Sequence, residues 1–341
     1  MRILVTGGAG YVGSHAAKLL AERGHEPWIM DSLVEGHRPA VGKMPFVQVD
    51  LLDREKIASA IKANRIEAVM HFAALAYVGV SVTEPATYYR NNVVGSLSLF
   101  DAMRDAGIGK IVFSSSCATY GNPERVPITE DHPQNPISPY GYTKLVVERI
   151  LADYARAYGF SYAALRYFNA SGAAADGTLG EDHDPETHLI PLVLQVALGQ
   201  RDSVDIFGTD YPTPDGSCIR DYIHVDDLAE AHLLSLEKLA AGKPGMAIKL
   251  NLGTGNGASV KEVIEHCRSI TGRPIKAREV GRREGDPPQL VADASEARRV
   301  LGWQAKHTSI RDVIASAWAW HQAHPHGYGG DPPQKEFASL L

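Results

Sequence analysis

Arg2-Ile3-Leu4-Val5-Thr6-Gly7-Gly8-Ala9-Gly10-Tyr11-Val12-Gly13 joins a short aliphatic run to a loop rich in glycine. The aliphatic run predicts a buried parallel strand, and residues 14–20 after the loop predict a helix. Gly8, Gly10 and Gly13 fit the spacing of a dinucleotide-binding loop, while Gly7, Gly10 and Gly13 fit its wider variant. In both cases the missing Cβ atoms let backbone N–H groups and the helix N-terminus approach a pyrophosphate.

A second strand, predicted over residues 27–30, ends in Asp31, which lies 18 residues after Gly13. A carboxylate near this position holds the ribose hydroxyls of a bound dinucleotide. It also repels a 2′-phosphate, so the sequence favours NAD over NADP as the cofactor. The competing interpretation is a glycine-rich turn followed by an ordinary surface aspartate.

Strands and helices alternate up to about residue 170. Further strands are expected over residues 46–49, 68–72, 110–115 and 162–167, and helices over 54–63, 85–106 and 139–158. This alternation predicts an α/β fold, a Rossmann-type doubly wound parallel sheet with right-handed crossovers. Ligands then bind outside the carboxyl ends of the strands.

Beyond Gly172 the alternation gives way to loops and shorter elements, which indicates a smaller C-terminal α/β lobe for the substrate. We therefore expect an NAD-binding domain over residues 1–170 and a substrate-binding lobe over 171–328. A returning segment near 220–240, with a strand at 222–225 and a helix at 227–239, joins the first domain. Residues 329–341 are expected to form a loosely ordered tail.

The composition is that of a globular enzyme, with 44% hydrophobic residues and a net charge of −6. No basic field argues for a nucleic-acid partner, and no apolar run is long enough to span a membrane. The opening core strand is not a signal peptide. Cys117, Cys218 and Cys267 are widely spaced without metal-ligand spacing, so we expect a cytoplasmic protein without a metal site.

Tyr140 and Lys144 occur in Ser138-Pro139-Tyr140-Gly141-Tyr142-Thr143-Lys144. If Pro139 opens a helix, the four-residue spacing places the phenol and the ammonium on one face. An ammonium favours the phenolate and lowers the tyrosine pKa, which makes the side chain a usable proton carrier. The alternative is a surface helix with an incidental tyrosine and lysine, so the interpretation also needs a cofactor and a third group.

Several motifs together resemble a known family. They are the Gly7–Gly13 loop, Ser114-Ser115-Ser116, Tyr140-x-x-x-Lys144 and Arg166-Tyr167-Phe168-Asn169, with the more specific Phe207-Gly208-Thr209-Asp210-Tyr211-Pro212-Thr213, Asp215-Gly216, Ile219-Arg220-Asp221-Tyr222-Ile223-His224-Val225 and Arg282-Arg283-Glu284-Gly285-Asp286. The first set resembles the extended short-chain dehydrogenase/reductase superfamily. From Met1 to about Tyr328 the chain is more closely similar to the UDP-glucose 4-epimerase (UDP-galactose 4-epimerase) family within it.

The resemblance implies an isomerase that epimerises C4 of a UDP-sugar through a transient 4-keto intermediate, with NAD tightly bound and regenerated in each turnover. Tyr140 would take the proton from the sugar 4-hydroxyl, and Lys144 would hold the nicotinamide ribose and keep the Tyr140 pKa low. Ser116 would hydrogen-bond the 4-oxygen. Without these partners, Ser116 reads as a capping hydroxyl at a strand end.

The segment after Ser116, Cys117-Ala118-Thr119-Tyr120-Gly121, lacks the acidic residue that related dehydratases and decarboxylases carry there. Returning the hydride to the sugar is therefore the expected reaction. We interpret Cys117 as a packing residue.

The resemblance also implies a set of ligand contacts. The cofactor-binding residues are Gly7, Gly10, Tyr11, Val12, Gly13, Asp31, Asp50, Leu51, Phe72, Ala73, Ala74, Asn92, Lys144 and Tyr167. The substrate-binding residues are Ser116, Tyr140, Asn169, His188, Leu189, Phe207, Arg220, Arg283, Asp286 and Leu290.

Some of these contacts have a stated role. Arg220 and Arg283 would clamp the diphosphate, and Phe207 would lie beside the uracil. Asp50 has a plain alternative as the cap of the helix that follows it.

Three positions depart from the family pattern. Ala76 stands where some members have a lysine that contacts the cofactor, His188 stands where many have asparagine against the diphosphate, and Leu290 occupies the gate at the sugar 2-position. We expect UDP-glucose and UDP-galactose as substrates, with UDP-xylose/UDP-arabinose or UDP-N-acetylglucosamine as alternatives.

Two alternatives come from other functional classes. One is a nucleotide-sugar ketoreductase, and the other is a non-catalytic NAD sensor. The family also implies a homodimer paired through the helices at 85–106 and 139–158.

Overall fold

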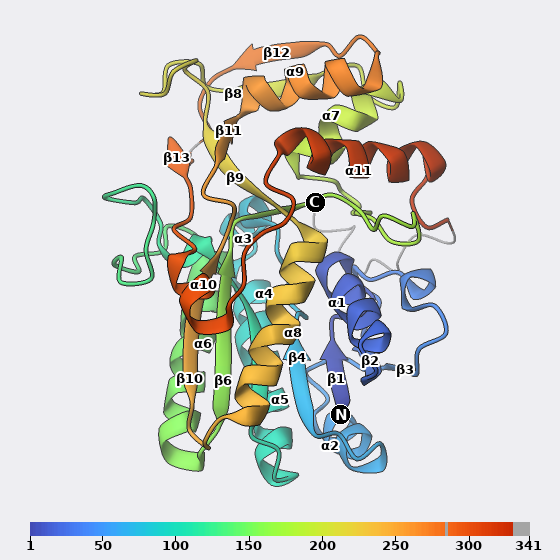
Figure 1. Ribbon diagram of the computed structural model, residues 1–341, viewed down its shortest axis with the longest axis vertical. Helices are drawn as coiled ribbons and strands as arrows, with labels where there is room; N and C mark the ends of the chain where they lie inside the picture. The colour runs from blue at the N-terminus through green and yellow to red at the C-terminus, as the bar shows by residue number, and fades with distance from the viewer. Residues whose placement is uncertain (284–285, 330–341) are drawn as a thin grey trace.

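The computed structural model describes residues 1–283 and 286–329 (Figure 1). Its centre is a seven-stranded sheet in the order β10-β6-β5-β4-β1-β2-β3, with every neighbouring pair parallel. The strands are β1 Arg2–Thr6, β2 Glu26–Asp31, β3 Phe46–Gln48, β4 Ala68–His71, β5 Lys110–Ser116, β6 Ser161–Tyr167 and β10 Ala247–Leu252. The predicted doubly wound α/β sheet is confirmed. The predicted tail lies outside the described residues from residue 330 onward, as do Glu284 and Gly285.

Helices pack on both faces of this sheet. The bounds are α1 Tyr11–Glu22, α2 Arg54–Ala63, α5 Gly95–Asp105, α6 Pro139–Tyr158 and α8 Val225–Ala241. Helices α1 and α8 stand side by side in front of the sheet in Figure 1 and share one buried aliphatic core with it, which Leu20 and Leu236 exemplify. Helices α2, α5 and α6 share a second core on the other face, which includes Ile57, Phe100 and Leu151.

Two predicted helices match the structure because local signals define both of their ends. Helix α2 begins where the Asp53 carboxylate accepts from Lys56 N at 3.1 Å. Helix α6 begins where the Ser138 hydroxyl accepts from Gly141 N at 3.2 Å. It ends at Gly159, whose φ of 72° is the left-handed conformation typical of helix ends.

The single helix predicted over residues 85–106 is wrong as a regular α-helix. The structure has α4 Pro85–Tyr88, then a π-helical segment Tyr89–Val94, then α5. A shorter helix, α3 Val78–Thr83, precedes them. The wider π turn changes the angular position of the residues that follow, and such turns often occur at functional sites.

The returning segment contributes more to the sheet than the sequence indicated. Strand β9 Ile219–His224 leads into α8, and the chain then adds β10 beside β6 as the seventh strand of the sheet. In the parallel register Leu252 lies opposite Tyr167. Residues far beyond 170 therefore complete the sheet that carries the candidate site.

The elements in the upper part of Figure 1 surround a third buried core, with Val193, Ile264 and Ile314 among its members. They are α7 Leu189–Ala197, β8 Val204–Phe207, β11 Gly257–Ser259, α9 Val260–Thr271, β12 Ala277–Val280 and α11 Ile310–Ala323. The short strands β7 Asn169–Ser171 and β13 Gln289–Leu290 lie outside that core, and α10 Ser295–Leu301 packs through Ala297 on the core that α1 and α8 share. Strand β9 pairs with β7, β11 and β13, and β8 pairs with β12.

Within the described residues, no helix combines the length and the apolar character that a membrane crossing requires.

Candidate active site

The glycine loop follows β1 at the point where the strand order of the sheet reverses, between β1 and β4. Gly7 has a φ of 71°, and a Cβ there would lie 2.4 Å from Ala73 N. A Cβ on Gly13 would lie 2.1 Å from the Gly7 carbonyl oxygen, whereas a Cβ on Gly10 would meet only that oxygen, at 3.4 Å. A Cβ on Gly8 would also be crowded, 2.9 Å from Ile29 Cγ2, so the contacts fit both glycine spacings, and the positive φ of Gly7 favours the wider one.

The loop and the helix after it fit a pyrophosphate. Helix α1 starts at Tyr11 with Gly10 as its N-cap, so the backbone N–H groups of Tyr11 and Val12 lie in the first turn. These first-turn N–H groups have no partner within the helix, and the helix dipole adds partial positive charge there. The open face at Gly10 leaves room for an anion to reach them.

Asp31 lies at the end of β2, as predicted, and 8% of it is exposed. Its carboxylate accepts from Ala9 N at 3.0 Å and from Leu33 N at 2.9 Å. Burial raises its pKa, and these backbone hydrogen bonds oppose the rise. Asp31 therefore fixes the glycine loop as well as offering a carboxylate to a ribose.

The predicted adenine pair lies between β3 and α2. The Asp50 carboxylate accepts from Leu52 N at 2.8 Å, and Leu51 is buried. The alternative role for Asp50 as a helix cap is wrong, because Asp53 caps α2. After β4, the Phe72 ring packs on the ring of His232 with centroids 4.7 Å apart.

Asn92 lies in the π-helical segment and is buried. Its side chain accepts from Leu75 N at 2.8 Å and donates to Leu75 O and to the Thr143 hydroxyl, both at 3.0 Å. It thereby ties the chain after Ala73 and Ala74, which passes the glycine loop, to the helix that carries Tyr140.

The predicted proton-transfer residues meet at the carboxyl end of β5. Tyr140 and Lys144 lie on α6 and are 9% and 3% exposed, and Ser116 is 8% exposed. Lys144 Nζ donates to Ser114 O at 2.7 Å and lies 5.7 Å from the centroid of the Tyr140 ring. Tyr167, opposite Ser116 in the sheet register, shares a hydrogen bond of 2.6 Å with the Ser114 hydroxyl.

One electrostatic expectation is reversed. Burial raises the pKa of Tyr140 well above its usual range, Tyr167 adds to the rise, and an interaction with the Ser116 hydroxyl partly opposes it. Burial also lowers the pKa of Lys144 to about 7, against the opposing effect of Glu148. Without the cofactor, Lys144 therefore holds its proton too weakly, and the Tyr140 phenol is too deeply buried, for Lys144 alone to produce a phenolate.

Ser116 has two possible roles, and the structure is compatible with both. Its hydroxyl accepts from Ala118 N at 3.1 Å, which caps a short 3₁₀ turn, Cys117–Thr119. Burial raises the pKa of Cys117 to about 12, so its thiol stays protonated, as the packing interpretation requires.

A buried ion pair behind the site did not emerge from the sequence. Glu148 and Arg166 are both buried, with Arg166 Nη2 to Glu148 Oε2 at 2.7 Å and Arg166 Nε to Glu148 Oε1 at 2.9 Å. The Ser115 hydroxyl donates to Glu148 as well. Glu148 continues the four-residue spacing of Tyr140 and Lys144 along α6, and that spacing was the available signal.

On the substrate side, the two predicted arginine clamps converge on one carboxylate. Arg220 Nη2 lies 2.7 Å from Asp286 Oδ1, and Arg283 Nη2 lies 3.1 Å from Asp286 Oδ2. The Arg283 guanidinium also lies over the Phe207 ring, 5.5 Å from its centroid. Four of the residues predicted to bind the nucleotide, Arg220, Arg283, Asp286 and Phe207, thus lie together.

The other predicted substrate residues lie on separate elements. Asn169 opens β7 and pairs with Tyr222 of β9. Leu290 of β13 packs against the small buried cluster that contains Cys117 and Phe168, next to the catalytic strand end. His188 is the N-cap of α7, which begins at Leu189.

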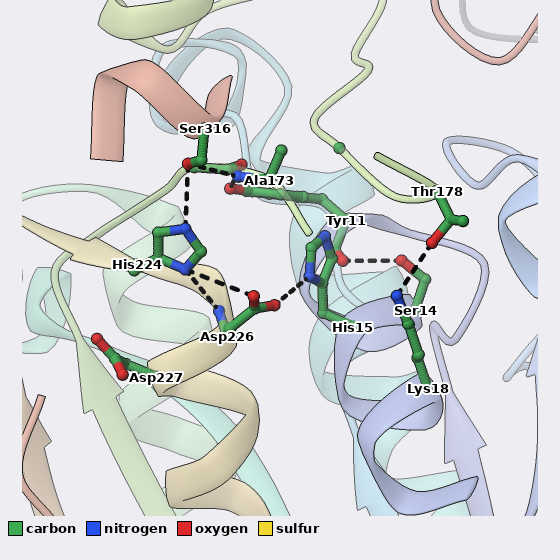
Figure 2. Close-up of polar contacts among 12 residues, drawn as sticks. Tyr11, Ser14, His15, Lys18, Ala173, Thr178, His224, Asp226, Asp227 and Ser316 are labelled. Atoms are coloured by element: carbon green, nitrogen blue, oxygen red, sulfur yellow. Dashed lines mark hydrogen bonds and ion pairs between the residues drawn. The ribbon is translucent and has the colours of Figure 1, made fainter. Parts of the chain in front are cut away.

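Figure 2 shows the joint where α1, the helix after the glycine loop, meets the chain after β7, the start of α8 and Ser316 of α11. Tyr11 donates to Gly172 O at 2.6 Å, so its side chain is used in this joint and its backbone remains for the cofactor. His15 Nδ1 lies 2.8 Å from Asp226 Oδ1 at the start of α8. His224 caps α8 and also contacts the Ser316 hydroxyl, at 3.1 Å.

Comparisons with known proteins identify the family of this chain. Residues 3–253 match the model of the NAD dependent epimerase/dehydratase family. A UDP-glucose 4-epimerase of Halalkalibacterium halodurans is 50% identical over 336 residues, which cover 98% of this chain and 100% of the relative.

Two solved structures are similar over nearly the whole chain. The structure of UDP-glucose 4-epimerase from Brucella ovis in complex with NAD has a TM-score of 0.91 and 51% identity, covering 93% of this chain and 97% of that one. The structure of UDP-glucose-4-epimerase from Stenotrophomonas maltophila with bound NAD and formylated UDP-arabinopyranose has a TM-score of 0.91 and 44% identity, covering 95% and 99%. The chain belongs to the NAD dependent epimerase/dehydratase family.

Proposed function

We propose that this protein is an isomerase that interconverts UDP-glucose and UDP-galactose by epimerisation at C4, with NAD as a bound cofactor. The observation that carries the proposal is the meeting of Tyr140, Lys144 and Ser116 at the carboxyl end of β5, in the same sheet as the glycine loop. The names of relatives at about half identity over nearly the full length favour this reaction over the alternatives.

The glycine loop, the first turn of α1 and Asp31 are placed to hold the cofactor. When bound, NAD supplies a reversible hydride acceptor, so that a sugar alcohol can pass through a ketone and return with either configuration. Lys144, whose ammonium donates to Ser114 O, is placed to hold the nicotinamide ribose.

Tyr140 is the group that moves the proton. Its phenol is buried and its pKa is raised, so it needs added positive charge to ionise. Lys144, whose Nζ lies 5.7 Å from the centroid of the Tyr140 ring, would provide part of that charge. Ser116, which interacts with the phenol, is placed to hydrogen-bond the sugar 4-oxygen and to keep it in line with Tyr140.

The nucleotide end binds where Arg220, Arg283 and Asp286 meet. A diphosphate offers the same oxygen geometry to the guanidinium forks as the Asp286 carboxylate does. Phe207 is 41% exposed, and its ring is available to pack beside a uracil. When the substrate binds, the two arginines therefore exchange the Asp286 carboxylate for the phosphate oxygens.

We also propose a cytoplasmic homodimer. Its support is a set of exposed apolar side chains on the helices around residues 85–106 and on α6, namely Tyr89, Val94, Leu97 and Tyr142. A dimer interface along these helices would cover this exposed apolar surface.

The test is a panel of UDP-galactose, UDP-N-acetylglucosamine and UDP-xylose, assayed for the 4-epimer with purified protein and no added cofactor. Turnover of UDP-galactose at the highest kcat/KM supports the proposal. Activity that requires stoichiometric NADH would instead indicate a ketoreductase. Bound NAD without turnover of any sugar would indicate an NAD sensor.

A further inference from the structure

A second cluster of reactive side chains lies in the segment before α7, outside the proton-transfer site. Glu181, His183, Glu186 and His188 each present one nitrogen or oxygen ligand atom, and these atoms all lie within 4.8 Å of one another. The spacing Glu-x-His-x-x-Glu-x-His brings two imidazoles and two carboxylates together from eight consecutive residues. No step proposed above uses Glu181, His183 or Glu186.

The distances from the two imidazole Nδ1 atoms to the nearest carboxylate oxygens resemble those around a tetrahedral metal ion, with Glu186 presenting Oε2 to His183 and Oε1 to His188. His183 Nδ1 lies 3.3 Å from Glu181 Oε1 and 3.6 Å from Glu186 Oε2. His188 Nδ1 lies 2.6 Å from Glu181 Oε1 and 3.6 Å from Glu186 Oε1. Zinc bonds of about 2.0–2.1 Å to nitrogen and oxygen place tetrahedral ligands about 3.3 Å apart. Three of the four distances are already close to that value, and the fourth is a hydrogen bond that a metal would replace.

The burial of the cluster also favours a cation. The Glu181 and Glu186 side chains are only 4% exposed each, and that of His183 is 18% exposed. Buried carboxylates are stable only when they are paired or coordinate a metal. Two imidazole nitrogens with two carboxylate oxygens suit zinc, whereas magnesium prefers octahedral oxygen ligands.

Two further contacts point to a ligand. Nδ1 of His183 is buried and makes no hydrogen bond, although two carboxylates lie nearby. The Glu186 carboxylate is oriented by Thr187 N and His188 N, which donate to its Oε1 at 2.7 and 2.8 Å. Outer contacts of this kind are typical of carboxylates that bind metals.

We propose that Glu181, His183, Glu186 and His188 bind one zinc ion in a closed structural site. Four protein ligands leave no open position, so the ion does not activate water. In this site the His188 side chain is a metal ligand and not the diphosphate contact that the sequence predicted. The ion holds the segment before α7 against Tyr11 at the start of α1. The rings of Tyr11 and Tyr77 stand edge-on to the His183 ring there, with centroids 6.3 and 6.1 Å away. The expectation of no metal came from cysteine spacing and overlooked this run of histidine and glutamate.

The test uses the full-length, tag-free protein with its NAD, treated with a chelator and then titrated with ZnCl₂. We expect one zinc per chain by calorimetry and elemental analysis, and no binding of MgCl₂. CoCl₂ should give the intense visible absorption of a tetrahedral centre. His183→Asn should weaken zinc binding by at least about 100-fold, because loss of a ligand exceeds the effect of an outer contact. Glu186→Gln should weaken it in the same direction.

His307→Asn is the matched control. His307 Nδ1 lies 3.3 Å from Asp227 Oδ2, and its side chain is 42% exposed, the same as His188. Within residues 1–283 and 286–329, however, it belongs to no cluster of three or more such ligands. Its replacement should leave zinc binding unchanged.

Less than one zinc per wild-type chain, an octahedral cobalt spectrum, or undiminished binding by His183→Asn would overturn the proposal. The cluster would then be a network of ion pairs. Because stoichiometry and the cobalt spectrum are measured on the wild-type chain, the proposal stays testable even if a variant fails to fold.

Discussion

The proton-transfer residues and the nucleotide-binding residues of this site are held in opposite ways. Tyr140, Lys144 and Ser116 lie on a regular helix and strand and are buried, with Lys144 bonded to the backbone of β5 and Ser116 to the turn that follows it. Arg220 and Arg283 instead pair with Asp286, and the Arg283 side chain is 59% exposed. The proposed proton-transfer groups are therefore preorganised in the fold, whereas the proposed substrate-binding arginines would have to exchange Asp286 for the substrate.

Replacing Tyr140 by Phe is the most severe test of the preorganised proton-transfer residues. The change removes the proton carrier but keeps the ring, so kcat should fall by about 10³-fold or more while bound NAD stays unchanged. A coupled assay of UDP-galactose conversion measures kcat, and release of NAD on denaturation measures the cofactor. Retained activity would refute the assigned role of Tyr140.

Glu148→Gln tests how far that preorganisation depends on the buried ion pair. The variant leaves the Arg166 guanidinium, of which 2% is exposed, without its charged partner. Breaking a buried pair from one side lowers the free energy of unfolding by about 3–5 kcal/mol. Denaturant unfolding with saturating NAD measures this loss.

The control for this experiment is Glu296→Gln, which breaks an exposed pair with Arg299. Its unfolding midpoint should not move. Equal behaviour of the two variants would show that burial of the Glu148 pair has no special role.

Arg220→Met tests the arginine contacts that are proposed to exchange Asp286 for the substrate. The variant removes a guanidinium fork that binds oxygens, and charge-assisted hydrogen bonds contribute about 1.5–3 kcal/mol. The KM for UDP-galactose should therefore rise about 10- to 100-fold, with a much smaller change in kcat. Arg282→Met is the matched control, because Arg282 pairs with Asp210 instead. A fall in kcat without a rise in KM would place Arg220 in the chemical step.

The smallest effect is a pH dependence of the cofactor-free protein. Burial lowers the pKa of Lys144 to about 7 from an ordinary 10.5. Below pH 7 the folded and unfolded states both carry the proton, and the cost of burying it is fully present. Above pH 7 only the folded state loses the proton, so stability should rise by about 1.4 kcal/mol per pH unit.

Urea unfolding of the cofactor-free protein at pH 7 and pH 8.5 measures this slope. Lys144→Met, which has no proton to lose, should lack the part of the slope that Lys144 contributes. An identical slope in the two proteins would contradict the lowered pKa.

The preorganised proton-transfer residues were also easier to predict from the sequence than the substrate-binding contacts. The glycine loop and the spacing of Tyr140 and Lys144 are local patterns, and local geometry alone brings their groups together. The bounds of α2 and α6 follow from capping residues within the same segments.

The features that were missed depend on contacts between distant parts of the chain. Arg166 and Glu148 lie on different elements, and no local pattern announces their pairing. The π turn at Tyr89–Val94 has no glycine or proline to mark it, although Asn92 within it contacts Leu75 and Thr143. The raised pKa of Tyr140 reflects how deeply the side chain is buried, which only the packed structure reveals.

The seventh strand has a consequence for how this chain can be cut. A fragment ending near residue 170 would contain the glycine loop and Tyr140, yet it would lack β10 and leave one side of β6 bare. A bare strand presents a row of unpaired N–H and C=O groups that templates aggregation. The same fragment would also lose α8 and expose the aliphatic surface of α1. This fragment should therefore aggregate when it is expressed alone.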